Sequence, residues 1–322
     1  MKHVSIEILR LCPNNCKHCS SDSGPNTNDY IISFDIIKNV FDGLKRLGTE
    51  EVSISGGEPF LHKDLVNIVK YGKEKGFKIF VYTSGIIFDN SSKYTYLNEE
   101  IIKELSEINL DKLIFNFQSL KEDVYNNIMG TNGNLNLVKK SIEISRKNKI
   151  WTELHFVPMK YNYKEIPDII KYVYENSIDR VSFLGLVPHG RAKNNKEELY
   201  LNEEENMFVK TLLDRFNTGT SKIRVGIPLQ LKTSCCKCNA VSNKLYVKFD
   251  GNVYGCEAFK YYPLFDNNNE EIHPDNIFDK DIEWIYKNSE YLKASLKEKS
   301  IIFKRTERKE SCPVQEEYRE LK

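Results

Sequence analysis

Three cysteines stand close together near the start of the chain, at a spacing that can hold a metal cluster. Cys12, Cys16 and Cys19 follow the apolar run Val4–Leu11, and Pro13 keeps the loop between them out of a helix. Cysteine thiolates bind iron–sulfur clusters, and ferredoxin motifs supply four to each cluster. Three thiolates on one loop can therefore bind three irons of a [4Fe–4S] cube and leave the fourth iron open.

A structural zinc ion is the alternative for these cysteines. Structural zinc takes four ligands, usually from paired Cys-x2-Cys units. His18 can supply a fourth ligand only by straining the same short loop. The number of ligands therefore favours an iron–sulfur cluster.

A second group of cysteines lies in the last third of the chain. It comprises Cys235, Cys236, Cys238, Cys256 and Cys312. Disulfide scaffolds are short secreted chains, whereas this chain has 322 residues and 8 cysteines in two separate groups. We therefore expect metal or redox chemistry at both groups.

A glycine-rich turn, Gly56-Gly57-Glu58-Pro59, follows the second expected strand. The two glycines allow the backbone to approach a ligand closely, and the Glu58 carboxylate can accept a hydrogen bond from an ammonium group. Taken alone, this segment also fits an ordinary turn between a strand and a helix.

Short β-rich runs alternate with helical periodicity up to residue 187. The expected strands are Val4–Leu11, Glu51–Ser55, Lys78–Thr83, Lys112–Gln118, Trp151–Pro158 and Arg180–Val187. The first expected helix begins after the N-cap Ser33 and ends at Gly48. Four more are expected at about Lys63–Lys75, Asn98–Glu107, Leu135–Lys147 and Lys164–Asn176. Repeated βα units predict an α/β fold with a parallel sheet, here a partial (β/α)6 TIM barrel. Its active site should lie at the C-terminal ends of the strands.

The pattern changes near residue 190. Asn202 and Glu205 form a capping box that opens a helix to about Phe216. Leu245–Phe249 and Val253–Tyr254 flank an Asp-Gly turn and predict a β-hairpin. Another helix is expected over Ile282–Leu296. We expect a barrel at 1–190, a linker with a bridging helix at 191–231, and a small hairpin-plus-helix module at 232–322.

The composition narrows the classes of partner. Lysine and arginine number 47 against 46 acidic residues, so no overall positive field favours nucleic acid or an anionic membrane surface. No apolar run approaches the roughly 20 residues of a membrane span. We expect a cytoplasmic protein that binds neither a membrane nor nucleic acid.

Together, Cys12-x3-Cys16-x2-Cys19 after the first strand and Ser55-Gly56-Gly57-Glu58-Pro59 after the second resemble the radical S-adenosylmethionine (SAM) superfamily. The resemblance implies that the cysteines hold a [4Fe–4S] cluster whose open iron is chelated by SAM. It also implies that Gly56–Pro59 holds the methionine amino group of SAM. Such an enzyme takes an electron from a flavodoxin- or ferredoxin-type donor, cleaves SAM to a 5′-deoxyadenosyl radical and abstracts hydrogen from a substrate.

The same resemblance suggests further SAM contacts. Ser84 lies in Thr83-Ser84-Gly85, where the family often has Thr-Asn-Gly. Asn116 and Gln118 lie where it often has a segment that touches the ribose, and His18 lies where it usually has an aromatic residue near the adenine. Each of these also fits an ordinary polar group at a strand end.

Arg191 follows the sixth expected strand. Its guanidinium can pair with a carboxylate of SAM or of the substrate. The alternative is a solvated residue that opens the linker.

The later cysteines resemble the start of a SPASM or twitch extension, in the pattern Cys238-x12-Gly251-x4-Cys256. Only Cys312 follows, so the resemblance implies one auxiliary [4Fe–4S] cluster. Its possible ligands are Cys235, Cys238, Cys256 and Cys312. A three-cysteine set would leave an iron open to substrate, and zinc remains the alternative because Cys-x2-Cys beside a hairpin also fits a zinc ribbon.

Cys236 is left over from this ligand set. Adjacent side chains of an extended segment point to opposite faces, so Cys236 should face away if Cys235 faces the cluster. Some family members that invert an amino-acid centre use a cysteine thiol to return a hydrogen atom, and Cys236 resembles such a donor. It can also replace Cys235 as a ligand or be a buried small hydrophobe.

Members with such extensions modify peptides, proteins and small molecules. We favour a peptide or protein substrate, with epimerisation or cross-linking of a ribosomally made peptide. The alternative is a dehydrogenase or mutase of an aminoglycoside- or nucleotide-like small molecule. Because the sequence starts at the cluster strand, we expect a peptide to need a separate recognition protein or direct binding by the barrel mouth.

Two classes without SAM chemistry also fit the cysteines, namely a zinc-stabilised binding module and an electron-transfer protein. Neither needs a ligand-binding turn at Gly56–Pro59, which therefore argues against both.

Overall fold

The computed structural model describes residues 1–27, 29–89, 91–216, 219–231, 238–305, 312 and 314. Within them, nine strands form one sheet in the order β11-β10-β1-β2-β3-β6-β7-β8-β9. The strands are β1 (His3–Glu7), β2 (Glu51–Ser55), β3 (Lys78–Thr83), β6 (Lys112–Asn116), β7 (Thr152–Phe156), β8 (Arg180–Phe183), β9 (Ile223–Val225), β10 (Lys244–Val247) and β11 (Val253–Tyr254). Every pair in the sheet is parallel except β10 with β11.

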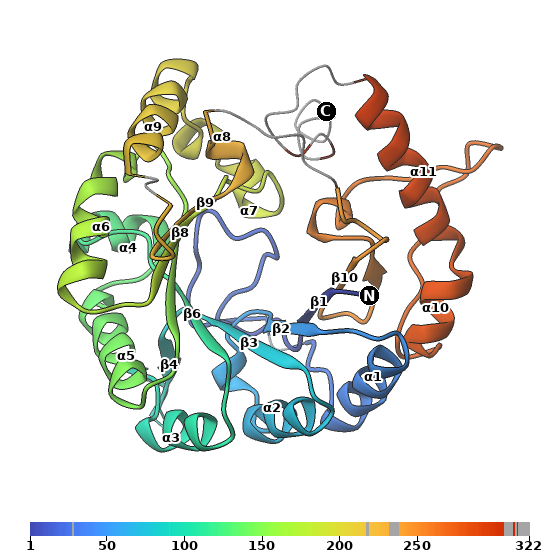
Figure 1. Cartoon of the computed structure of the whole chain (residues 1–322), viewed down its shortest axis with the longest axis horizontal. Helices are drawn as coiled ribbons and strands as arrows, with labels where there is room; N and C mark the ends of the chain where they lie inside the picture. The colour runs from blue at the N-terminus through green and yellow to red at the C-terminus, as the bar shows by residue number, and fades with distance from the viewer. Residues whose placement is uncertain are drawn as a thin grey trace.

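The sheet curves into an open barrel, with helices on its outside (Figure 1). The outer helices are α1 (Phe34–Arg46), α2 (Leu65–Glu74), α3 (Glu99–Glu107), α4 (Glu122–Met129), α5 (Leu135–Lys147) and α6 (Ile166–Glu175). The Ser33 hydroxyl accepts a hydrogen bond from the Ile36 N–H, so the predicted N-cap of α1 is confirmed. The six predicted strands and the partial barrel are confirmed as well.

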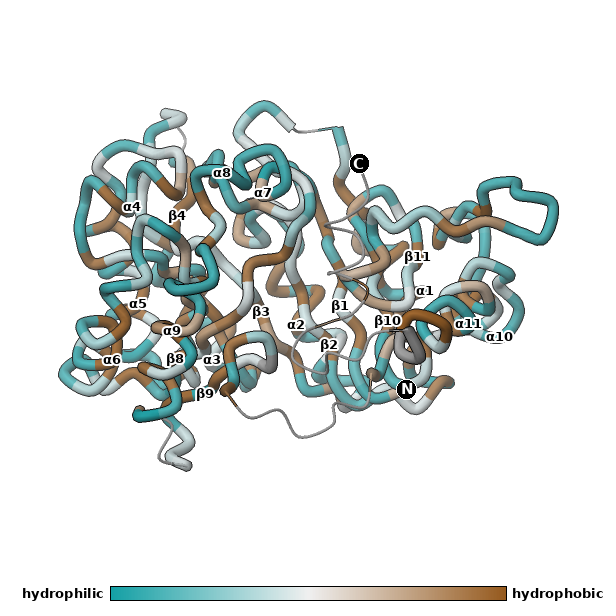
Figure 2. Tube along the Cα trace, turned by 90° about the horizontal axis from the view of Figure 1, so that it is seen from above, coloured by the Kyte–Doolittle hydropathy of each residue, from teal (hydrophilic) through white to brown (hydrophobic). Residues whose placement is uncertain are grey.

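The core lies between the strands and these helices. Figure 2 shows hydrophobic segments along the strands in the middle of the molecule and hydrophilic segments along the outer helices and loops. Ile54, Val81 and Phe115, on three neighbouring strands, are completely buried. This packing holds the strands in one register, so that their C-terminal ends meet at one rim of the barrel.

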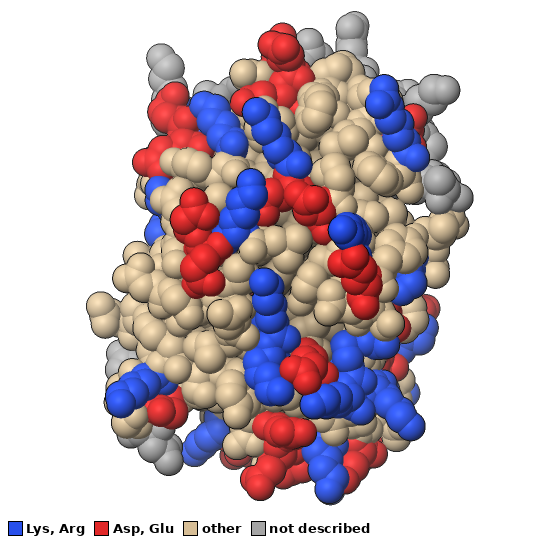
Figure 3. Space-filling model, turned by 90° about the vertical axis from the view of Figure 1, so that its left-hand side faces the viewer, with Lys and Arg blue, Asp and Glu red and all other residues tan. Residues whose placement is uncertain are grey.

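The outer surface on the side of α5 and α6 carries both signs of charge (Figure 3). Ion pairs such as Lys147 with Glu143 and Lys171 with Glu175 join neighbouring turns of these helices. The interspersed charges agree with the near balance of the whole sequence. Among the described residues, none of the helices is long and apolar enough to cross a lipid bilayer.

The part of the chain beyond residue 190 joins the same sheet. It contributes α7 (Arg191–Asn194), α8 (Lys196–Leu199), α9 (Glu203–Phe216) and the strands β9, β10 and β11. The capping box is confirmed, because the Asn202 and Glu205 side chains each accept a hydrogen bond from the other residue's backbone N–H. The hairpin of β10 and β11 is also confirmed, and Gly251 in its turn has a φ of 87°.

The pairing of β10 with β1 continues the sheet past the boundary expected near residue 190. At the other edge, β9 pairs with β8. The division into 1–190, 191–231 and 232–322 therefore stays a prediction about units that share one sheet.

Some elements differ from the expected ones. The expected helix over Ile282–Leu296 is two helices, α10 (Ile282–Asn288) and α11 (Glu290–Arg305). They are separated at Ser289, whose backbone is not helical (ψ 122°) and whose hydroxyl accepts a hydrogen bond from the Leu292 N–H, as an N-cap does. The structure also has a small hairpin of β4 (Ile86–Phe88) and β5 (Tyr94–Tyr96), which the sequence analysis missed together with α4 and β9.

Candidate active site

The first three cysteines lie on the loop that leaves the C-terminal end of β1. Cys12 and Cys16 are buried, and Cys19 is partly buried. Burial raises the pKa of the Cys16 thiol to about 12, and the nearby Cys19 adds to this effect. Burial also raises the pKa of Cys12, with Cys16 as the next contributor. The three thiols are thus close enough to interact, and their thiolate forms need a cationic group beside them.

Helix α4 supports this loop from one side. The backbone N–H groups of Asn15 and Lys17 donate hydrogen bonds to the carbonyl oxygens of Met129 (3.2 Å) and Ile128 (2.9 Å). Gly130 ends α4 with a φ of 63°, and a Cβ at this position would lie 2.4 Å from the Asn15 carbonyl oxygen. A glycine is therefore required for α4 to approach the loop so closely.

Arg191 holds the same loop from the other side. Its Nε donates to the Cys16 carbonyl oxygen (2.8 Å), and a terminal nitrogen donates to the Ser23 carbonyl oxygen (2.6 Å). Its backbone N–H donates to the Cys19 carbonyl oxygen (3.0 Å). Its guanidinium also opposes the rise in the Cys16 pKa. The expected pairing of Arg191 with a carboxylate stays a prediction, and the structure gives this side chain a contact with the cysteine loop in addition.

The glycine-rich turn packs directly against the segment that precedes Cys12. The N–H groups of Gly57 and Glu58 donate to the carbonyl oxygens of Leu9 and Leu11, both at 2.8 Å. A Cβ at Gly57 would lie 2.0 Å from the Leu11 carbonyl oxygen, and Gly56 has a φ of 138°. The two sequence motifs are therefore joined by backbone contacts that larger side chains would prevent. The contact of Gly56–Pro59 with SAM stays a prediction.

Glu58 is completely buried at the ends of β2 and β3. Its Oε1 accepts from the Thr83 hydroxyl (2.7 Å) and the Phe60 N–H (3.2 Å). Its Oε2 accepts from the Ser84 hydroxyl (2.6 Å) and the Ser84 N–H (2.7 Å). Burial raises the pKa of this carboxyl to about 7, although these hydrogen bonds lower it. Since a carboxylate has about four acceptor positions, an ammonium group can bind Glu58 directly only by displacing one of these donors.

Pro59 begins a short 3-10 helix, Pro59–Leu61, for which Glu58 is the N-cap. Ser84 thus bonds to the glycine-rich turn instead of pointing freely from β3. Ser84 and Glu58 therefore form one buried polar unit.

Asn116 and His18 meet at the C-terminal end of β6. The Asn116 Nδ2 lies 3.5 Å from the His18 Nε2, and burial lowers the pKa of His18 to about 4. Gln118 is completely buried, donates to Asn116 Oδ1 and accepts from the Val157 N–H (2.9 Å). The structure therefore brings Asn116 to His18 of the cysteine loop, whereas both ends of the Gln118 amide are bonded within the protein.

Several buried polar atoms around the cysteine loop have no hydrogen-bond partner among the described residues. They are both polar side-chain atoms of Asn14, the hydroxyl groups of Ser23 and Tyr125, and Nδ1 of His18. Burial raises the pKa of Tyr125, and Cys16 and Cys12 are near enough to add to the effect. Buried polar groups in native proteins nearly always have partners. The loop therefore fits a bound polar cofactor that contacts these atoms.

No three His, Cys, Asp or Glu side chains in the described part of the chain converge tightly enough to bind a single metal ion. The thiolates of a [4Fe–4S] cube bind different irons, so they need not converge on one point. The cysteine loop thus offers the three ligands of such a cluster without a preformed site for one ion.

Two of the later cysteines also come together. Cys256 follows β11, burial raises its pKa to about 12, and Cys312 is near enough to add to this rise. Cys238 precedes β10, and its carbonyl oxygen accepts from the Lys299 ammonium of α11 (3.4 Å). Cys235 and Cys236 lie outside the described residues. The auxiliary ligand set and the role of Cys236 stay predictions.

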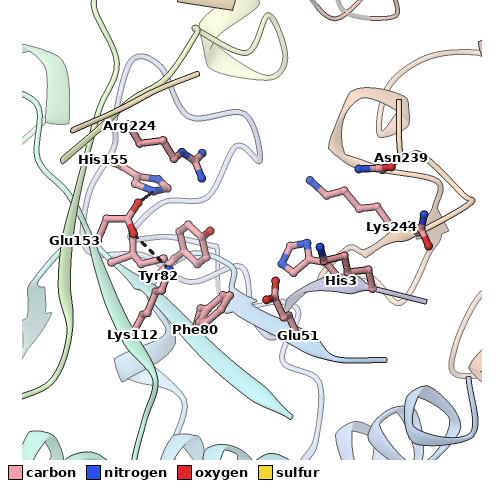
Figure 4. A pocket seen from close by; sticks show the side chains of 13 residues that line it. His3, Glu51, Phe80, Tyr82, Lys112, Glu153, His155, Arg224, Asn239 and Lys244 are labelled. Atoms are coloured by element: carbon pink, nitrogen blue, oxygen red, sulfur yellow. Dashed lines mark hydrogen bonds and ion pairs between the residues drawn. The ribbon is translucent and has the colours of Figure 1, made fainter. Parts of the chain in front are cut away.

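A hollow of about 420 Å³ lies at the opposite, N-terminal ends of the strands (Figure 4). Its wall includes His3 of β1 and Glu51 of β2 on one side, and Tyr82 of β3, His155 of β7 and Arg224 of β9 on the other. The sequence analysis missed this site. The sequence did contain a signal for it. Polar residues of the strands, such as Glu153, His155 and Arg224, alternate with buried apolar residues and therefore share the face that lines the hollow.

Three comparisons with known proteins bear on this geometry. The model of the Radical SAM superfamily matches residues 6–173, slightly more than half of the chain. Fe-coproporphyrin III synthase of Methanosarcina barkeri is 27% identical over 231 residues, which are 71% of this chain and 54% of that protein. PqqA peptide cyclase of Bradyrhizobium diazoefficiens is 27% identical over 203 residues, which are 61% of this chain and 49% of that protein. The chain spans about half the length of these curated relatives.

The fold resembles that of Streptococcus suis SuiB in its crystal structure bound to precursor peptide SuiA. The TM-score is 0.71 at 16% sequence identity, and the match covers 91% of this chain and 66% of that one. The likeness in fold therefore extends well past the residues matched by the family model.

Proposed function

Because the chain belongs to the radical SAM superfamily, we propose that it cleaves SAM reductively and uses the resulting radical to abstract hydrogen from a substrate. Members of this superfamily use a [4Fe–4S] cluster and SAM, and we assign the cluster to Cys12, Cys16 and Cys19. The observation that carries the proposal is the set of buried polar atoms around this cysteine loop that have no hydrogen-bond partner within the described residues. They indicate that a polar group binds where the family places its cofactors.

When bound, the cluster and SAM supply the electron transfer and the carbon radical. The protein supplies position and protection from water. Gly56 and Gly57 fix the glycine-rich turn against the cysteine loop, and Arg191 and α4 hold that loop in place. Asn116 lies beside the loop and His18 within it, where they can contact the nucleoside part of SAM.

We further propose a peptide or protein substrate, with epimerisation or cross-linking as the reaction. PqqA peptide cyclase and the SuiB complex with precursor peptide SuiA are named for peptides, and both resemble this chain. A flavodoxin- or ferredoxin-type donor would supply the electron, and a separate recognition protein or the barrel mouth itself would bind the peptide. Cys235, Cys238, Cys256 and Cys312 would hold an auxiliary [4Fe–4S] cluster, and Cys236 would return a hydrogen atom to the substrate.

A small-molecule substrate is the second candidate, because Fe-coproporphyrin III synthase is similar to this chain to the same degree. The two candidates differ in what they require of the barrel interior. A peptide needs an opening through which an extended chain can pass, whereas a small molecule can be enclosed.

Iron content and SAM cleavage test the proposal. Anaerobically reconstituted protein should carry about eight irons, four for each of two cubes, and should form 5′-deoxyadenosine when reduced with SAM present. Replacement of Cys12, Cys16 and Cys19 together by alanine should leave about four irons and no 5′-deoxyadenosine. Ser91→Ala, in an exposed loop, is the control. Undiminished SAM cleavage in the triple variant would rule the proposal out.

A further inference from the structure

The hollow at the N-terminal ends of the strands lies between the two edges of the open sheet. Arg224 belongs to β9 at one edge, and Lys244 belongs to β10, next to β1, near the other. In Figure 4 the two side chains point into the hollow from opposite walls and toward one another. Two cations that face each other across a hollow favour an anion between them.

Arg224 is available for such a ligand. Its neighbours Ile223 and Val225 are buried, so the alternation along β9 turns Arg224 to the other face, toward the hollow. Its side chain is exposed, and within the described residues its guanidinium forms no hydrogen bond or ion pair. Lys2, which also lines the hollow, has an exposed ammonium group that is likewise unpaired within that part of the chain.

The acidic groups of the hollow are already paired. Glu153 is 2% exposed and accepts from the Ser182 hydroxyl and His155 Nε2, with Lys112 at 3.8 Å. Glu51 lies 3.8 Å from the Lys78 ammonium. The positive charges of Arg224 and Lys2 therefore remain in excess.

The other groups that line the hollow do not change the excess positive charge of Arg224 and Lys2. Lys244 lies 2.7 Å from Glu257, so its charge is largely balanced. Burial lowers the pKa of both His3 and His155, which keeps these rings neutral at pH 7. Phe80, Tyr82 and Ile114 give the hollow an apolar wall, which favours an anionic group attached to an organic molecule.

The hollow and the cysteine loop lie toward opposite ends of strand β6. Lys112, Ile114 and Asn116 alternate along the same face of β6, from the hollow to the residue that meets His18. At about 3.3 Å per residue, the four steps from Lys112 to Asn116 span roughly 13 Å. An extended peptide covers this distance with about four residues.

We infer that this hollow binds a carboxylate of the substrate peptide, with Arg224 as its principal ligand and Lys2 and Lys244 beside it. A guanidinium can bind both oxygens of a carboxylate at once, which fixes orientation as well as charge. The acidic residue would lie about four residues from the modified position, by the strand length given above. This inference rests on the proposed peptide substrate and specifies its chemical class as an acidic peptide.

Binding of short peptides to the reconstituted protein tests the inference without turnover. The probes are fluorescent tetraglutamate and tetraglutamine peptides and a nucleoside triphosphate, with anisotropy as the readout. Tetraglutamate should bind in preference to tetraglutamine, and Arg224→Gln should weaken its binding about tenfold or more, as expected for loss of a charged hydrogen bond. Arg224→Lys should retain part of the affinity, because it keeps the charge and loses the fork.

Arg215→Gln is the matched control, because Arg215 is exposed on α9 and does not line the hollow. It should leave peptide binding unchanged. Equal affinity for the two peptides, or unchanged affinity in Arg224→Gln, would overturn the inference, and so would a preference for the nucleoside triphosphate. If iron content and 5′-deoxyadenosine formation are normal while acidic peptides fail to bind, this inference falls and the proposed SAM chemistry stands.

Discussion

The guanidinium of Arg191 donates a 2.8 Å hydrogen bond to the carbonyl oxygen of Cys16, although 175 residues separate the two in the chain. The bond joins the cysteine loop after the first strand to the segment that follows the last strand of the predicted barrel. Formation of the cysteine loop therefore depends on a part of the chain that no local motif connects to it.

Replacement of Arg191 by alanine should weaken cluster binding. The change leaves the carbonyl oxygens of Cys16 and Ser23 without their donors, at a cost of about 1–3 kcal/mol each where they are buried. We expect a lower iron content after reconstitution and a broadened electron paramagnetic resonance signal of the reduced cluster. Lys196→Ala, an exposed position on α8, should change neither measurement. Iron content and signal equal to wild type in Arg191→Ala would show that Arg191 does not hold the loop.

Replacement of Gly57 by alanine should separate the two sequence motifs. Its Cβ would lie 2.0 Å from the Leu11 carbonyl oxygen, which is backbone and cannot rotate away. We expect a loss of about 1–3 kcal/mol in the free energy of unfolding, together with reduced iron binding.

Gly24→Ala is the control for this change. A Cβ at Gly24 would meet only the Asn15 side chain, at an ordinary distance of 3.6 Å. Denaturant unfolding and iron analysis compare the two variants. Equal stability of both would mean that the turn can move away from the loop without loss.

The buried Glu58 should make stability depend on pH. Its pKa is raised to about 7 in the folded chain, so the folded state binds the proton more tightly than the unfolded state does. Its contribution is fully present below the ordinary pKa of a glutamate and is lost as the pH rises through about 7. The slope between these limits is about 1.4 kcal/mol per pH unit.

Glu58→Gln removes this titration. At pH 5 the variant should be less stable than wild type by about 1–3 kcal/mol. In the variant an NH2 group replaces one of the carboxyl oxygens, and this group cannot accept the hydrogen bonds that the oxygen accepts. The difference should shrink toward pH 8, where wild type has lost its advantage. Urea unfolding at several pH values measures it, and a difference independent of pH would contradict the raised pKa.

The second cysteine group should account for half of the iron. Replacement of Cys256 and Cys312 by alanine should lower the iron content from about eight to about four per chain and leave SAM cleavage by the first cluster detectable. Cys236→Ala is the matched control, since the proposed ligand set does not include it. Zinc in place of iron in the wild-type protein would refute the auxiliary cluster, and loss of iron in Cys236→Ala would make Cys236 a ligand.

The sequence predicted the regular elements well where the local signal was strong. The bounds of β2, β3 and α5 agree with the predicted ranges, and the caps at Ser33 and Asn202 formed as expected. Strands β4, β5 and β9 have three residues each, which is too short for an alternating pattern to stand out. Helix α4 did carry a signal, because Val124, Tyr125, Ile128 and Met129 recur at helical spacing before Gly130.

The candidate site could be predicted only for residues that belong to a short, recognisable sequence motif. The cysteine loop and Gly56–Pro59 were visible as patterns, and the structure joins them. The contact of Arg191 with Cys16 and the enclosure of Glu58 by Thr83 and Ser84 depend on which strand ends meet, and the sequence spacing does not specify that. The place of Arg224 in the wall of the hollow was equally hidden, because exposed arginines are common in any sequence.

The parallel pairing of β1 with β10 joins residues 3–6 to residues 244–247. On the ribosome, β1 can pair with β2 once β2 has emerged, but its other edge stays unpaired until β10 has been made. At roughly 5–20 residues per second, that edge waits about 10–40 s, during which its N–H and C=O groups can pair with another chain. The strand that leads into Cys12 is thus synthesised long before its second edge is covered. Cluster insertion before β10 has been made would therefore meet a loop whose strand still has an open edge.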